Sequence, residues 1–60
     1  MELDYKAIGK RIKIARIQAE LSQEALAEKA DLSPTHMSNI ENANTKLSLP
    51  VLVDLAAVLE

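Results

Sequence analysis

The chain has 60 residues, of which 48% are hydrophobic and only one is aromatic, and its formal net charge is −2. This length predicts one domain with a marginal core, and the lack of cysteine excludes disulfides and thiolate metal sites. No apolar run reaches the ~20 residues of a membrane span and the start Met-Glu-Leu-Asp is no signal peptide, so we expect a cytoplasmic protein without a membrane partner.

The first predicted helix covers residues 5–19 and has Asp4 as its cap. Its apolar residues follow helical spacing: Ile8, Ile12, Ala15 and Ala19. It also holds five of the seven basic residues: Lys6, Lys10, Arg11, Lys13 and Arg16. The acidic net charge argues against a nucleic-acid partner, although a local basic patch can still attract DNA. The alternative is that Lys6, Lys10 and Lys13 form an ordinary solvated face.

Three Leu-Ser pairs predict the starts of the other helices. In each pair a large apolar residue follows four positions after the Ser: Leu21-Ser22 with Leu26, Leu32-Ser33 with Met37, and Leu47-Ser48 with Leu52. A capping Ser with an apolar residue before it and another at the fourth helical position is typical of a helix N-terminus. The predicted helices therefore cover residues 23–30, 34–41 and 49–60. The first two form a helix-turn-helix, because their caps are only eleven positions apart.

The turns and the last helix are unusual. The turns after the first two helices need left-handed residues, yet the chain places Glu20 and Asp31 there instead of glycine. In the last helix a buried stripe is expected: Leu52, Leu55, Ala56 and Leu59. Further apolar residues lie off that stripe: Val51, Val53 and Val58. A helix that is apolar on most sides needs more cover than three neighbours give.

The third predicted helix has a polar face opposite Met37 and Ile40. Uncharged hydrogen-bonding residues recur on that face: Thr35, Ser38, Asn39 and Asn42. Asn39 can pair bidentately with adenine, and Thr35 can contact a base, a phosphate or a thymine methyl. His36 flanks this face, and Gln23 begins the neighbouring helix, where its amide suits a phosphate oxygen. The alternative is the ordinary polar surface of a small helical bundle.

Arg16 lies on the apolar face of the first helix and therefore needs a partner. Glu41 is the natural one, because it shares the inner face of the third helix with Met37 and Ile40. We expect an Arg16–Glu41 ion pair, at least partly buried, that fixes the third helix to the first. The alternative is that Arg16 reaches solvent and Glu41 is a surface acid.

Catalysis is not expected. His36 is the only histidine and has no cysteine or carboxylate spaced for a metal site or a nucleophile relay. The chain has no glycine-rich phosphate loop, and Glu24 and Glu28 fit a solvated helix face. We therefore expect no enzyme activity, no cofactor and no small-molecule ligand.

The stretch LSQEALAEKADLSPTHMSNIE, residues 21–41, resembles the Cro/repressor-type helix-turn-helix family, also called the XRE or lambda repressor-like family. The flanking segments IGKRI, residues 8–12, and NTKLSLP, residues 44–50, agree with it. The resemblance implies an all-α, four-helix lambda repressor-like bundle that binds double-stranded DNA. It implies base reading from the third helix: Pro34, Thr35, His36, Ser38 and Asn39. It implies phosphate contacts from the second helix and the following loop: Gln23, Asn42, Asn44 and Lys46. It also implies a small crossing residue at Ala27 and an internal Arg16–Glu41 pair.

The chain departs from this family in three ways. The family often has glycine where this chain has Glu20, Asp31 and Ala43. Pro34 offers a base no polar group, so any contact there is apolar. The family also usually continues into a fifth helix, which this sequence lacks, so we expect either a minimal or truncated domain, or cover of the last helix by another chain.

Two functions from different classes fit these features. The first is a sequence-specific transcriptional regulator, a homodimer whose two copies bind half-sites about one helical turn apart. The second is a protein-interaction module, such as a regulatory or antitoxin-like subunit, with the same fold and little DNA binding. The second is supported by the acidic net charge, by the lack of Lys or Arg between Leu32 and Asn44, and by the apolar last helix.

Overall fold

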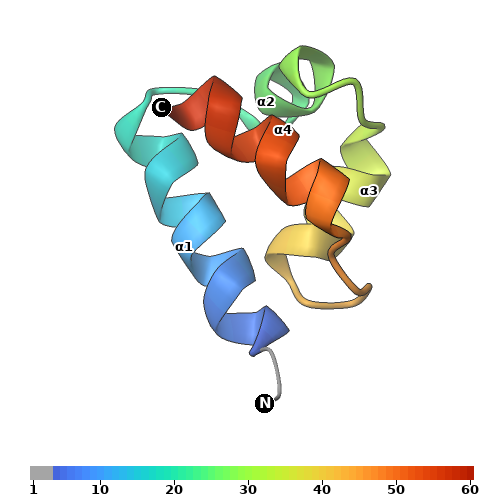
Figure 1. Cartoon of the computed structure of the whole chain (residues 1–60). Helices are drawn as coiled ribbons and strands as arrows, with labels where there is room; N and C mark the ends of the chain where they lie inside the picture. The colour runs from blue at the N-terminus through green and yellow to red at the C-terminus, as the bar shows by residue number, and fades with distance from the viewer. Residues whose placement is uncertain (1–3) are drawn as a thin grey trace.

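A computed structural model describes residues 4–60, which form the expected all-α arrangement of four helices (Figure 1). The helices are α1 (Tyr5–Gln18), α2 (Gln23–Lys29), α3 (Pro34–Glu41) and α4 (Leu49–Leu59). Three of them end one residue earlier than predicted, because Ala19, Ala30 and Glu60 are C-caps. None of the four is long and apolar enough to cross a membrane.

Each helix begins at a side-chain cap, and all four predicted caps are confirmed. The cap oxygen accepts from the backbone N–H three residues later, which satisfies one of the donors left free in the first turn. The bonds are Ala7 to Asp4 at 3.0 Å, Ala25 to Ser22 at 3.0 Å, His36 to Ser33 at 3.1 Å and Val51 to Ser48 at 3.4 Å.

The first three helices end in left-handed turns formed without glycine. Glu20, Asp31 and Ala43 have φ of 60°, 58° and 59°. Each turn closes with the two hydrogen bonds of a Schellman motif. In each turn the bond that spans five residues runs from Leu21 N to Arg16 O, Leu32 N to Ala27 O or Asn44 N to Asn39 O, at 3.1, 2.7 and 2.8 Å respectively. The left-handed conformation expected at Glu20 and Asp31 is therefore confirmed.

All four helices contribute to one apolar core. Its buried members are Ile12, Leu26, Ala27, Ala30, Met37, Ile40 and Leu55. α3 packs on both α1 and α2, and α4 packs on the same two helices. In Figure 1 α4 crosses in front of α2. The buried side of α3 is thereby fixed by two neighbours, which leaves its other side for solvent.

Gly9, the only glycine in the chain, lets α1 approach the end of α3 backbone to backbone. A Cβ atom at this position would lie 2.5 Å from Ile40 O and 2.7 Å from Glu41 O. Sequence reasoning did not single out Gly9. The signal was present, because a glycine inside a helix costs about 1 kcal/mol relative to alanine and so usually has a packing reason.

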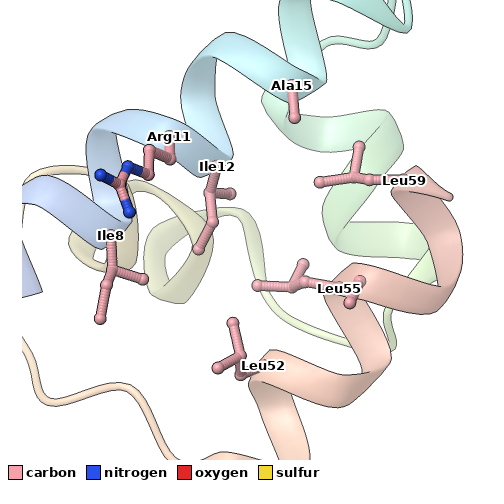
Figure 2. Close-up of a pocket in the computed structure, with 8 residues that line it drawn as sticks. Ile8, Arg11, Ile12, Ala15, Leu52, Leu55 and Leu59 are labelled. Atoms are coloured by element: carbon pink, nitrogen blue, oxygen red, sulfur yellow. The ribbon is translucent and has the colours of Figure 1, made fainter.

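The buried stripe expected on α4 is only partly present. Leu55 is buried, but Leu52 and Leu59 are half-buried and Ala56 is exposed. These residues face Ile8, Ile12 and Ala15 of α1 across a hollow of about 370 Å³, with Arg11 at its edge (Figure 2). Because this hollow lies between the two helices, the stripe is covered only in part: Leu55 is buried in the core and Leu59 packs against it. Val51 and Val58, which the sequence placed off the stripe, also pack against the core. Off the stripe, Val53 is 58% exposed.

Candidate nucleic-acid interface

The outward face of α3 presents the five residues expected to read bases. Pro34 and Thr35 are exposed, and His36, Ser38 and Asn39 are half-buried. The opposite face is closed, since Met37, Ile40 and Glu41 are all buried. An eight-residue helix has about two turns, so these five side chains occupy a short ridge. We call these five residues the α3 ridge.

Local hydrogen bonds define both ends of the ridge. Ser33 caps α3, and Pro34 occupies its first turn, where a proline loses no helical bond. At the other end Asn42 Nδ2 donates to Ser38 Oγ at 3.4 Å. The end of α3 is closed further by Asn44 N, which donates to Asn39 O. The helix therefore presents its polar side chains from a backbone with defined limits.

Behind the ridge, Arg16 and Glu41 form a bidentate ion pair. Arg16 Nε donates to Glu41 Oε2 at 2.7 Å, and Nη2 donates to Oε1 at 3.3 Å. The two side chains are only 12% and 1% exposed. Arg16 Nη1 also donates to Leu21 O at 2.8 Å, which ties the pair to the turn after α1. Such a two-pronged pair fixes orientation as well as distance.

Gln23 joins this cluster, which sequence reasoning missed. Its Nε2 donates to Glu41 Oε1 at 3.0 Å. From the sequence we expected the Gln23 amide to contact a DNA phosphate, whereas in the structure one of its N–H groups donates to Glu41. An amide nitrogen has two N–H groups, so the second is still available to an outside acceptor. Three donors from α1 and α2 thus surround one buried carboxylate of α3.

The loop after α3 alternates between inward and outward residues. Asn42, Asn44 and Lys46, the three residues predicted to contact phosphate, are exposed, while Ala43 and Thr45 between them are half-buried. The left-handed backbone at Ala43 reverses the chain at this point. Amide and ammonium donors therefore follow one another directly beside the C-terminal end of α3.

The interface is nearly neutral. From Pro34 to Thr45 the sequence has one charged side chain at neutral pH, Glu41, and its charge is matched by Arg16. Lys46 is the first cation after α3. Among residues 4–60, no three His, Cys, Asp or Glu side chains gather closely enough to hold a metal ion. Hydrogen-bonding groups, rather than charge, dominate this surface.

A family model described as helix-turn-helix matches residues 12–60, from the second half of α1 to the end of the chain. The match includes every residue of the α3 ridge, the loop that follows it and both partners of the ion pair. The chain matches none of the curated proteins compared with it.

Proposed function

Because the chain belongs to the Cro/repressor-type helix-turn-helix family, we propose that it is a transcriptional regulator that binds double-stranded DNA at specific sequences. The 60 residues act as one DNA-binding domain, and α3 lies in the major groove. The observation that carries this proposal is the α3 ridge: five accessible side chains on a helix whose opposite face is buried.

The base sequence of the DNA is read by hydrogen bonds and methyl contacts from the α3 ridge. Asn39 pairs bidentately with the N6 and N7 atoms of an adenine. Thr35 offers a hydroxyl and a methyl group, and Pro34 offers an apolar contact to a thymine methyl. His36 and Ser38 donate to or accept from neighbouring base edges.

The position of the protein along the duplex is fixed by uncharged hydrogen-bond donors and one cation around the α3 ridge. The outer N–H of Gln23, the amides of Asn42 and Asn44, and the Lys46 ammonium group contact backbone phosphates. Since Gln23 also bonds to Glu41 at 3.0 Å, its phosphate contact is connected to the ion pair that orients α3. Such positioning contacts carry no sequence information themselves.

The test is selection of bound duplexes from a random pool, followed by titration at low salt. We expect one family of related sites, bound at least 10³-fold more tightly than unrelated DNA, as is typical of specific binders. Binding no tighter than background at low salt, where attraction to phosphates is strongest, would contradict the proposal.

The same proposal includes a homodimer, in which two copies bind half-sites about 34–36 Å apart. Several large apolar side chains that would favour self-association are exposed: Ile14, Ile17, Leu49 and Val53. Sedimentation of the protein with its selected duplex should give two copies per site. A single copy on a non-palindromic site would rule the dimer out.

The alternative function is a protein-interaction module with the same fold and little DNA binding. The hollow between α1 and α4 favours it, because seven of its eight lining residues are apolar. The scarcity of cations from Pro34 to Thr45 favours it as well. Failure of the duplex selection, together with binding of a protein that is blocked by substitutions in this hollow, would establish the alternative.

A further inference from the structure

A second hollow, of about 320 Å³, lies between α1 and the end of α3. It is lined by Lys6, Lys10, Lys13, Glu41 and Asn42. The three lysines are exposed, and their spacing of four and three residues puts them on one face of α1. We call this the lysine hollow. Lys6 and Lys10 lie outside the residues that the family model matches.

The positive charge of this hollow is not cancelled locally. Among the residues that the structure describes, Glu41 is the only acid that lines it, and its two oxygens already accept from Arg16 and Gln23. Within residues 4–60 the only ion pair is the one between Arg16 and Glu41. The C-terminal end of α3 adds about half an elementary negative charge, which three ammonium groups outweigh. The hollow therefore attracts anions.

The lysine hollow adjoins the proposed DNA surface through Asn42. This residue lines the hollow and also donates to Ser38, which belongs to the α3 ridge. One continuous surface thus runs from the ridge, over the end of α3, to the basic face of α1.

Without the lysine hollow, the residues proposed to contact DNA carry little positive charge. Attraction between cations and phosphates supplies most of the non-specific affinity for DNA. Lys46 is the only cation among the residues proposed to contact bases or phosphates, in a chain of net charge −2. The cations beside that surface are those of the lysine hollow.

Building on the proposed function, we propose that the lysine hollow holds a backbone phosphate of the bound duplex, beyond the stretch that α3 reads. Lys10 and Lys13 neutralise that phosphate and its neighbour, and Asn42 donates to it from the ridge side. The bound duplex then contacts α1 as well as the helix-turn-helix.

Two double variants of equal net charge test this proposal. The first, Lys10→Gln with Lys13→Gln, removes two cations from the hollow. The control, Arg11→Gln with Lys29→Gln, removes two exposed cations that do not line it. Binding of the full chain to its selected duplex and to unrelated DNA is measured at several salt concentrations, after circular dichroism has verified that both variants fold.

For the hollow variant we expect the slope of log K against log salt to fall by up to about 1.8, since each lost phosphate contact removes about 0.9. Affinity near 0.1 M salt should fall roughly tenfold or more on both DNAs, because phosphates carry no sequence information. The control should keep a slope close to that of the wild type.

Three results would overturn the proposal. Equal losses in both variants would mean that only net charge matters, and unchanged slopes in both would mean that α1 does not contact DNA. Saturable binding of inorganic phosphate at Lys10 and Lys13, seen by NMR while the DNA slope stays unchanged, would make the hollow a small-anion site. If the wild type binds no DNA at all, the proposed function fails together with this one.

Discussion

Glu41 holds together the three helices that position the proposed DNA interface. Its buried carboxylate accepts from Arg16 and Gln23, and so connects α1, α2 and α3 at one point. A charged group in this position is tolerated only while its partners remain, because desolvation of an unpaired carboxylate is costly. The same contact therefore supports both the stability of the fold and the orientation of the α3 ridge.

Replacing Arg16 with Met should destabilise the protein by about 3–5 kcal/mol, the usual cost of leaving one partner of a buried pair alone. The double change Arg16→Met with Glu41→Leu should recover much of this loss, because no unpaired charge remains. Urea denaturation followed by circular dichroism measures both. Strict additivity of the two single changes would show that the pair is not coupled.

At the α3 ridge, Asn39→Ala should relax sequence preference at one base pair, with a loss of about 1–3 kcal/mol on the selected site only. Lys46→Ala should instead weaken binding to all sequences alike and lower the salt slope by about 1. Fluorescence anisotropy on matched and mismatched duplexes separates the two. A uniform loss for Asn39→Ala would mean that it contacts phosphate rather than a base.

At the scale of elements, the helix ends show what the sequence could predict. Caps such as Ser22 and Ser33 depend only on nearby residues, so the predicted helix starts agree with the structure. The contact of Gly9 with the end of α3 and the bond from Gln23 to Glu41 depend on how distant helices pack, which a single sequence does not specify. The α4 stripe was overestimated for the same reason, since periodicity gives the face of α4 on which Ala56 lies but not whether another helix covers that residue.

Ala43→Gly should stabilise the protein, because a left-handed residue with a Cβ costs about 1–2 kcal/mol that glycine avoids. Glu20→Gly should do the same, and Asp31→Gly should gain less, since Asp tolerates this conformation better. The matched control is Ala57→Gly on an exposed part of α4, which should destabilise by about 1 kcal/mol. Thermal unfolding of all four variants measures these shifts, and destabilisation by Ala43→Gly would contradict the explanation.

Gly9→Ala should destabilise the protein, although alanine is the better helix former. The new Cβ would meet the backbone oxygens of Ile40 and Glu41, so α1 and α3 must move apart, at a cost of about 1–3 kcal/mol. Lys10→Ala, at the exposed position next to it, serves as the control and should leave the free energy of unfolding almost unchanged. A variant as stable as the wild type would show that the two helices can separate freely.

At the scale of the whole molecule, the distribution of charge and the size of the core together determine how strongly DNA binding affects the protein. Five of the seven basic residues and none of the nine acidic ones lie between Tyr5 and Gln18, so α1 carries a formal +5 and the rest of the chain −7. Within residues 4–60 the core has seven buried apolar residues, and a chain of this length has a stability of only about 3–9 kcal/mol. A bound duplex therefore changes the stability of the whole molecule noticeably.

The selected duplex, at about 100 times its dissociation constant, should stabilise the protein by about 2.7 kcal/mol. For a domain of this size that corresponds to a rise in melting temperature of roughly 10 °C or more. An unrelated duplex at the same concentration should give a much smaller rise. Equal rises for both duplexes, measured by circular dichroism, would indicate that binding is not sequence-specific.

The glycine-free turns also bear on how far this chain can be redesigned. At Glu20, Asp31 and Ala43 the backbone holds a conformation that another residue type would adopt with less strain. Introducing glycine at these three positions, none of which belongs to the α3 ridge, would give a more stable scaffold. Libraries that diversify Thr35, Ser38 and Asn39 toward new operators should then yield more folded members than libraries made in the parent sequence.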